Sequence, residues 1–291
     1  LMYQIISEEN NNLTVRIPDF DPAHTFLCGQ CFRWNQEDGI WTGIANGRLI
    51  RLSFNDDVCT FFNMDKQEFT DVWVRYFDLE TDYGSIKKML SEKDEHLRNA
   101  VIHGFGIRLL QQEFYETLFS FIISQNNNIP RIKQIIEALS KSFGKPLDID
   151  NRLFGFPDVS ALASASPDKI SVCRGGYRCR YISETAKKLM EQSGFIDIIR
   201  GLTRTEAREL LLTLPGIGPK VADCVLLYSG LDRTAFPIDR WVKRVIEALY
   251  FKKGTDEKTI RDFSLEYFGE FSGIAQQYLF YYAREKKIGL V

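Results

Sequence analysis

The segment Leu210–Leu227 constrains the fold most, because it holds two glycines one residue apart between two apolar helical patterns. Gly216-Ile-Gly218 indicates a tight hairpin, after a helix that ends near Leu214. Pro219 follows, and proline is tolerated at the first position of a helix, where its missing N–H has no helical partner. The segment therefore predicts a helix–hairpin–helix.

The predicted hairpin has the features of a phosphate-binding surface. Gly216 and Gly218 let the backbone come close to a ligand, and the next helix starts with unpaired N–H groups at the positive end of its dipole. Such a surface binds phosphates without reading bases. A plain hairpin between core helices is the alternative. Because Leu-Pro-Gly-Ile-Gly has a helix on both sides, binding of DNA phosphates is the favoured interpretation.

Lys220 is the second residue of the helix that follows the hairpin. The helix dipole disfavours a cation there and favours the neutral amine. A neutral amine is a nucleophile that can form a Schiff base. Alternatively, Lys220 reaches outward to a phosphate as an inert cation. Spacing alone leaves both interpretations open.

Asp239 lies in Phe236-Pro-Ile-Asp-Arg-Trp-Val, at the expected N-cap of another helix. Capping alone explains an aspartate at this position. The functional hypothesis places its carboxylate beside an amine, where it accepts a proton and stabilises positive charge on a sugar. Arg240 next to the cap supplies the positive charge that a phosphate contact requires.

The N-terminal third alternates between apolar and polar residues and predicts an antiparallel meander. Asn46-Gly47 is typical of a type I′ hairpin turn, and Asp38-Gly39 marks another hairpin. The expected strands are Phe32–Asn35, Leu13–Ile17, Ile40–Ala45, Arg48–Phe54 and Val58–Phe62. From about Lys66 the pattern changes towards the helical period.

The rest of the chain predicts helices, with apolar stripes over Phe114–Ile123, Ile132–Leu139 and Tyr181–Met190. Thr203 and Glu206 fit a capping box at the start of another helix. We therefore expect an α+β protein: an antiparallel β-rich N-terminal domain over residues 1–105 and a helical domain over residues 106–291.

Composition excludes several classes of protein. The net charge of −2 does not by itself favour binding of a negatively charged nucleic acid. If the protein binds one, the basic residues must be concentrated on one part of its surface. No apolar run approaches the ~18 residues of a membrane span, and no signal-peptide pattern opens the chain, so we expect an intracellular protein with reduced thiols.

Cys28 and Cys31 have the spacing of a zinc or redox pair. With no second such pair, two ordinary thiols in a turn are favoured.

The hairpin motif and the aspartate motif, taken together, resemble those of a known family. The Leu-Pro-Gly-Ile-Gly-Pro-Lys hairpin, followed some twenty residues later by Pro-Ile-Asp, is similar to the helix–hairpin–helix/Gly-Pro-Asp superfamily of DNA glycosylases. The fuller resemblance is to the 8-oxoguanine DNA glycosylase/AP lyases. It spans nearly the whole chain and rests, in family order, on Cys28–Trp34, Ser124–Ile129, Gly176–Tyr181, Lys220–Cys224 and Gly273–Phe280.

The resemblance implies catalytic and base-binding roles. Lys220 resembles the Schiff-base lysine, and Asp239 the catalytic aspartate. The Gly29 carbonyl resembles the acceptor for the N7–H that 8-oxoguanine carries, whereas the N7 lone pair of guanine would face it unpaired. The residues expected around the flipped base are Cys224 and Phe280 on its two faces, Gln276 at its Watson–Crick edge, and Phe32 in the part of the lesion pocket that the N-terminal domain contributes.

The resemblance also implies contacts to the duplex. Asn126 resembles the residue that fills the hole left by the flipped base, and Tyr177 the wedge. Arg131 and Arg178 resemble the contacts to the opposite base. One departure is Trp241, where many relatives carry histidine. The remaining expected DNA contacts are Gly216, Gly218 and Arg240.

The expected function is base excision of 8-oxoguanine with strand cleavage by β-elimination, on double-stranded DNA containing oxidised guanine. We expect no cofactor beyond a monovalent cation at the hairpin carbonyls, a monomer without membrane contact, and a cytoplasmic, nucleoid-associated location. The first alternative is a monofunctional glycosylase for another damaged base, in which Asp239 activates water. The second is a non-enzymatic DNA-binding module that uses the hairpin alone.

Overall fold

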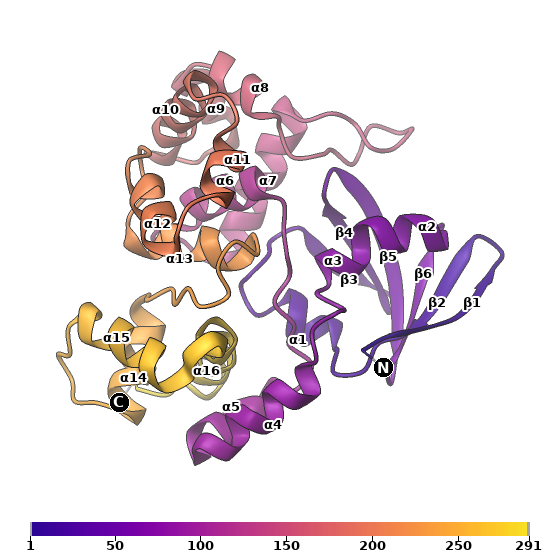
Figure 1. Ribbon diagram of the computed structural model, residues 1–291. Helices are drawn as coiled ribbons and strands as arrows, with labels where there is room; N and C mark the ends of the chain where they lie inside the picture. Colours follow the sequence, from indigo (N-terminus) through magenta and orange to yellow (C-terminus); the bar gives the residue numbers. More distant parts are fainter. Residues whose placement is uncertain (1, 290–291) are drawn as a thin grey trace. The chain divides into compact units, whose positions relative to one another are not determined.

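The computed structural model describes residues 2–289, which form two compact units (Figure 1). The first unit comprises the chain up to Gln30, Leu52–Gln111 and the chain from Leu226 onward, and the second comprises Cys31–Arg51 and Gln112–Val225. Each unit is discontinuous in sequence. The predicted domains, by contrast, are continuous, and the division near residue 105 stays a prediction.

The sheet has six strands in the order β1-β2-β6-β5-β4-β3. In the first unit, β1 (Gln4–Glu9), β2 (Asn12–Arg16) and β6 (Val58–Phe62) pair antiparallel, as Figure 1 shows. The second unit holds the hairpin of β3 (Trp34–Glu37) and β4 (Ile40–Ala45), and β5 (Arg48–Asn55) runs from the second unit into the first.

Strands β3 to β6 follow one another as in the predicted meander, whereas β2 lies beside β6 at the other end of the series and β1 was not predicted. Asn46 and Gly47 have φ angles of 51° and 67°, the positive pair that a type I′ turn needs. Leu13 and Val15 are fully buried along β2, as alternation requires. The sequence did not predict β1, because its residues are all exposed or half-buried and carry no clear apolar face.

The helices of the first unit pack around an aromatic core. Phe61 on β6 lies 5.1 Å from Phe69 and 5.9 Å from Phe77, measured between ring centres. A Cβ at Gly273 would lie 2.5 Å from the Arg233 carbonyl oxygen, so glycine lets the last helix approach that backbone. The helical segments are α1 (Pro22–Phe26), α2 (Lys66–Glu68), the π-helical η1 (Phe69–Trp73), α3 (Val74–Tyr76), α4 (Tyr83–Lys93), α5 (Glu95–His103), α14 (Arg240–Leu249), α15 (Glu257–Phe268), the 3₁₀ turn η3 (Gly269–Phe271) and α16 (Ser272–Lys286).

The second unit holds the predicted apolar helices and the hairpin. The predicted capping box is present, because the Thr203 side chain accepts from the Glu206 N–H while the Glu206 carboxylate accepts from Thr203. The helical segments are α6 (Phe114–Ser124), α7 (Ile129–Phe143), α8 (Val159–Ser164), α9 (Pro167–Ile170), the 3₁₀ turn η2 (Ser171–Cys173), α10 (Arg178–Glu191), α11 (Phe195–Arg200), α12 (Arg204–Leu212) and α13 (Pro219–Tyr228), which continues into the first unit. Within residues 2–289, no helix is long and apolar enough to cross a membrane.

Candidate active site and nucleic-acid interface

The predicted helix–hairpin–helix is present, with α12 before the hairpin and α13 starting at Pro219. Its two glycines serve different purposes. Gly216 has φ +76°, and a Cβ there would lie 2.4 Å from the Tyr181 ring, so the fold requires glycine. A Cβ at Gly218 would have nothing within 4 Å. Gly216 therefore packs the hairpin, while Gly218 leaves an open surface that a phosphate can approach.

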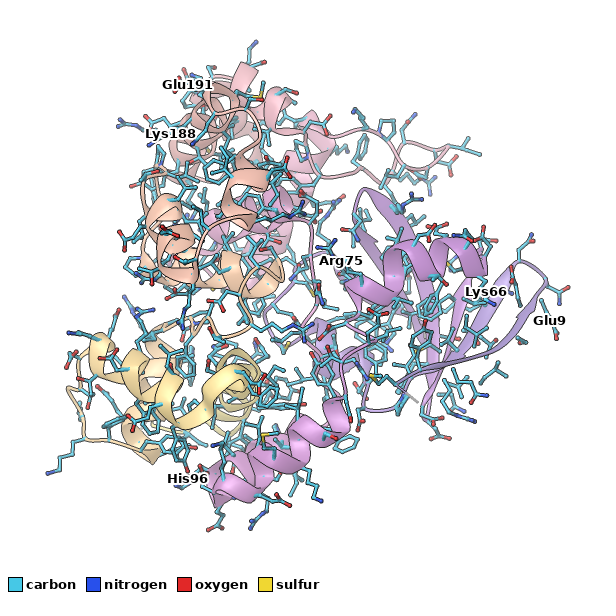
Figure 2. The ribbon with its side chains drawn as sticks, viewed as in Figure 1. Glu9, Lys66, Arg75, His96, Lys188 and Glu191 are labelled. Carbon is cyan, nitrogen blue, oxygen red and sulfur yellow. The ribbon has the colours of Figure 1, made fainter. Side chains whose placement is uncertain are left out.

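The hairpin carbonyls are braced from neighbouring segments of the second unit. The Thr213 carbonyl accepts from Lys188 Nζ at 2.6 Å, from α10, where Figure 2 labels Lys188. The Pro215 carbonyl accepts from Thr185 Oγ1 at 2.7 Å, and the Gly216 carbonyl from Gln125 Nε2 at 2.9 Å. Each of these three carbonyls thus accepts one side-chain hydrogen bond, and the expected monovalent cation at the hairpin stays a prediction.

Lys220 lies in the first turn of α13, and its side chain extends over an aromatic ring. Its Nζ is 5.0 Å from the centre of the Phe121 ring, and that ring packs edge-on against Phe32 at 5.6 Å. Cys224, one turn further along α13, is 2% exposed. In the second unit, the predicted nucleophile Lys220 and the predicted pocket residue Phe32 thus both lie against the ring of Phe121.

Phe32 also lines a cavity of about 510 Å³, together with Arg33. The Arg33 guanidinium lies 3.8 Å from the carboxylate of Glu116, in the first turn of α6. Burial raises the pKa of Glu116 to about 7, while Arg33 opposes the rise. Sequence reasoning missed this pair, because an acidic residue in the first turn of a helix is ordinary.

Asn126, Tyr177 and Arg178 come together in the second unit. Arg178 is 5% exposed, and its Nε donates to the Gln125 carbonyl at 3.0 Å and its NH2 to the Asn126 carbonyl at 3.1 Å. Tyr177 is 53% exposed, with its ring centre 4.5 Å from the Arg178 guanidinium. Arg178 therefore braces the loop that presents Asn126, and its predicted contact to the opposite base stays a prediction.

Asn126 and Arg131 are both exposed near the start of α7. Asn126 has φ +47°, a left-handed conformation that asparagine tolerates better than most residues. Arg131 follows the cap of α7, where Asn128 Oδ1 accepts from the Arg131 N–H at 3.0 Å. Both side chains are accessible to a DNA ligand, as the predicted contacts require.

In the first unit, hydrogen bonds hold the residues on both sides of Gly29, Cys28 and Gln30, in place. The Cys28 carbonyl accepts from Gln277 Nε2 at 3.0 Å. The Gln30 side chain donates to the Thr25 carbonyl at 2.8 Å and accepts from the Leu110 N–H at 2.9 Å. Gly29 itself has φ +89°, which favours glycine. Sequence reasoning missed the supporting role of Gln30, although it lies inside the quoted Cys-Gly-Gln-Cys motif.

Gln276 and Phe280 lie one turn apart on α16. Gln276 is 3% exposed, and its Nε2 is 3.5 Å from the Pro237 carbonyl oxygen. Its Oε1 is buried and accepts no hydrogen bond within the described part of the chain. A buried acceptor without a donor is costly, so it marks a position where a ligand can supply the donor. The half-buried ring of Phe280 lies 5.6 Å from the Arg284 guanidinium.

Asp239 caps α14, as predicted, because its Oδ1 accepts from the Val242 N–H at 2.8 Å. Arg240 follows it and is exposed. The cap accounts for the presence of Asp239, and its catalytic role stays a prediction. Across residues 2–289, no group of three or more His, Cys, Asp or Glu side chains could hold a metal ion.

Two family descriptions match the chain in succession. Residues 12–118 match the 8-oxoguanine DNA glycosylase, N-terminal domain, and residues 119–268 match the HhH-GPD superfamily base excision DNA repair protein. A probable N-glycosylase/DNA lyase from Methanothermobacter thermautotrophicus is 31% identical over 302 aligned positions, covering 93% of this chain and 96% of the relative.

Two solved structures from Clostridium acetobutylicum are also similar. The 8-oxoguanine glycosylase/lyase in complex with double-stranded DNA containing cytosine opposite 8-oxoguanine has a TM-score of 0.94 and 40% identity, covering 99% of this chain and 100% of that chain. The apo form of the same enzyme has a TM-score of 0.91 and 40% identity, and the match covers 97% of this chain and 100% of that chain. The similarity thus extends over both units.

Proposed function

The chain belongs to the HhH-GPD superfamily of base excision DNA repair proteins, with the N-terminal domain of 8-oxoguanine DNA glycosylases, and we propose that it flips 8-oxoguanine out of duplex DNA, excises it through a Schiff base on Lys220 and nicks the strand by β-elimination. It is a bifunctional N-glycosylase and DNA lyase.

Binding begins at the hairpin. The open surface at Gly218 and the N–H groups at the start of α13 receive a backbone phosphate. Lys220 follows Gly218 by two residues, so a phosphate held here brings a neighbouring sugar within reach of its amine. This spacing is the observation that carries the proposal, because it joins DNA binding to a nucleophile in one short segment.

Flipping the base costs a few kcal/mol, which contacts in the pocket offset. The Watson–Crick edge of 8-oxoguanine presents N–H donors, and the buried Oε1 of Gln276 is an acceptor without a donor. The Gly29 carbonyl accepts the N7–H that separates 8-oxoguanine from guanine. The apolar residues that we propose to contact the flipped base are Phe32 and Cys224 in the second unit and Phe280 in the first. Asn126 and Tyr177 are proposed to fill the gap that the base leaves in the duplex.

The chemistry proceeds in two steps. Lys220 attacks the sugar C1′, and the base leaves with the electron pair of its bond to C1′ and takes up a proton. Asp239 accepts the lysine proton and stabilises positive charge on the sugar. The C1′–O4′ bond then breaks, O4′ takes up a proton, and a Schiff base joins C1′ to Lys220. The resulting Schiff base makes a C2′ hydrogen acidic. Its loss expels the 3′ phosphate and cuts the strand. No step uses a metal ion, and the monovalent cation expected at the hairpin carbonyls takes no part in the chemistry.

We further propose that the protein acts as a monomer on double-stranded DNA in the cytoplasm, associated with the nucleoid. The DNA contacts named above come from one chain and need no second copy. Sedimentation of the protein with one equivalent of lesion duplex would test this stoichiometry, and a complex of two chains would contradict it.

Borohydride trapping tests the proposed chemistry. The protein is mixed with a duplex containing one 8-oxoguanine, or with a matched guanine duplex, and the Schiff base is reduced. We expect a covalent adduct with the lesion duplex alone, and none with Lys220→Gln. Base release without an adduct would support the monofunctional alternative, and binding without either would support the DNA-binding module.

A further inference from the structure

Two cysteines face each other across the base of a loop in the second unit. Cys173 ends η2 and Cys179 lies in the first turn of α10, with their Sγ atoms 4.0 Å apart. Both residues are nearly buried, at 2% and 3% exposure. A Cβ at Gly175 would lie 3.0 Å from the Cys179 sulfur and 3.3 Å from the Cys173 sulfur, so the glycine between them allows both thiols to pack against its backbone.

The enclosed loop carries two of the predicted DNA contacts, Tyr177 and Arg178. Arg178 NH1 donates to the Gly175 carbonyl at 3.2 Å, and Arg178 NH2 donates to the Asn126 carbonyl at 3.1 Å. The thiols pack on Gly175, Gly175 contacts Arg178, and Arg178 positions the loop of Asn126. A change in the distance between the sulfurs therefore reaches all three DNA-contacting residues.

We propose that Cys173 and Cys179 form a reversible intramolecular disulfide, and that this disulfide weakens binding of lesion DNA by displacing the loop of Tyr177 and Arg178. The effect on DNA rests on the proposed function. The formation of the disulfide does not.

The two sulfurs must come closer before the bond can form. A disulfide has sulfurs about 2.05 Å apart, so the two thiols must approach each other by about 2 Å. The loop between them contains Gly175 and Gly176, and Arg174 and Gly176 have positive φ angles of 57° and 62°. We expect this approach to shift the Gly175 backbone, because even a Cβ at Gly175 would lie 3.0 Å and 3.3 Å from the two sulfurs, and the Gly175 carbonyl accepts the hydrogen bond from Arg178.

The oxidant that we propose is a low-molecular-weight disulfide. The thiolate of Cys179 attacks one sulfur of the small disulfide and releases one small thiolate. The thiolate of Cys173 then attacks the Cys179 sulfur, forms the internal bond and releases the second small thiolate. The two protein thiols lose two protons and two electrons, and the small disulfide becomes two thiols. Burial raises the pKa of Cys173, so its thiolate is scarce near neutral pH and the internal bond should form faster at higher pH.

The test uses the full chain and oxidised glutathione, in excess, at mildly alkaline pH. We expect the loss of two hydrogen atoms by mass spectrometry, with a peptide map that joins residues 173 and 179. The dissociation constant for an 8-oxoguanine duplex should rise about tenfold and return to its starting value with dithiothreitol. Cys179→Ala should bind lesion DNA as the reduced protein does and should not react with the oxidant at Cys173. Cys173→Ala should stop at a mixed disulfide between Cys179 and one glutathione, which mass spectrometry detects, and should form no internal disulfide.

Three outcomes separate the two proposals. A chain whose Cys173 and Cys179 stay alkylatable after oxidation overturns the disulfide. A mapped disulfide with an unchanged dissociation constant overturns its effect on DNA. Failure of the reduced protein to prefer the lesion duplex contradicts the proposed function instead, while the mass measurement still decides whether the disulfide forms.

Discussion

The Nζ atom of Lys220 lies 5.0 Å from the centre of the Phe121 ring, so the candidate nucleophile is positioned on the face of an aromatic side chain. An aromatic face attracts an ammonium by about 1 kcal/mol but can neither take its proton nor share a lone pair. The ring therefore positions the amine without acting as its base. Because Phe121 also packs against Phe32, the nucleophile and one wall of the predicted pocket share a single support.

Lys220→Gln should abolish strand cleavage and borohydride trapping, because an amide cannot form a Schiff base. The dissociation constant for lesion DNA should change by less than about fivefold, since the phosphate is held mainly by backbone groups of the hairpin. Gel assays of cleavage and anisotropy measurements of binding check both parts. Lys188→Gln, on α10, is the matched control and should still be trapped. Residual cleavage by Lys220→Gln would show that another group is the nucleophile.

Asp239→Asn should slow base excision by about 10²–10⁴-fold, the usual range for loss of a positioned acid–base group. Asparagine caps helices as well as aspartate does, so the hydrogen bond to the Val242 N–H is retained and stability should stay within about 0.5 kcal/mol. Single-turnover excision and urea unfolding measure the two quantities. A rate close to that of the unmodified protein would leave Asp239 as a helix cap alone.

Gln276→Met should raise the free energy of unfolding by about 1 kcal/mol and weaken lesion binding at least about tenfold. Methionine has a similar size, and it removes a buried Oε1 that lacks a donor within the described residues. The same change deletes the acceptor that the Watson–Crick edge would use. Chemical unfolding and competition between lesion and guanine duplexes separate these effects. Unchanged preference for the lesion would exclude Gln276 from base recognition.

The two hairpin glycines provide a matched pair of variants. Gly216→Ala should cost about 2–3 kcal/mol of stability, because its φ is +76° and the new Cβ would lie 2.4 Å from Tyr181. Gly218→Ala should leave stability within about 0.5 kcal/mol, since its Cβ meets nothing within 4 Å.

DNA affinity distinguishes these two variants further. In Gly218→Ala the methyl group stands where a phosphate is proposed to approach, so the dissociation constant should rise about tenfold with an unchanged melting temperature. Full affinity in a stable Gly218→Ala protein would mean that the hairpin does not contact DNA at this residue.

Glu116 predicts a pH dependence of stability. Burial raises its pKa from 4.5 to about 7, against the opposing effect of Arg33. Between these two values, a rise in pH removes the Glu116 proton from the unfolded chain but not from the folded protein, so the free energy of unfolding falls. Glu116→Gln has no such proton. Its stability relative to the unmodified protein should therefore increase by about 2 kcal/mol from pH 5 to pH 8.

Urea unfolding at the two pH values measures this difference directly. A stability difference for Glu116→Gln that is constant across the range would mean that Glu116 titrates alike in the folded and unfolded states.

Local patterns were sufficient to predict most of the elements. The turn at Asn46-Gly47, the capping box of Thr203 and Glu206, and the start of α13 at Pro219 each depend on a few neighbouring residues, and all three were confirmed. Strand β1 was missed because its side chains carry no apolar alternation, and only pairing with β2 makes it a strand.

The sequence by itself determined the helix–hairpin–helix, the cap at Asp239 and the family, because each depends on residue types at short spacing. Only the tertiary structure decided that Arg178 is used to brace Gln125 and Asn126, that Gly216 is needed against Tyr181, and that two thiols 4.0 Å apart close the loop of Tyr177. These relationships join segments far apart in the chain or depend on the path of a loop. Tertiary packing determines these contacts, and the spacing of residues within a short segment does not predict them.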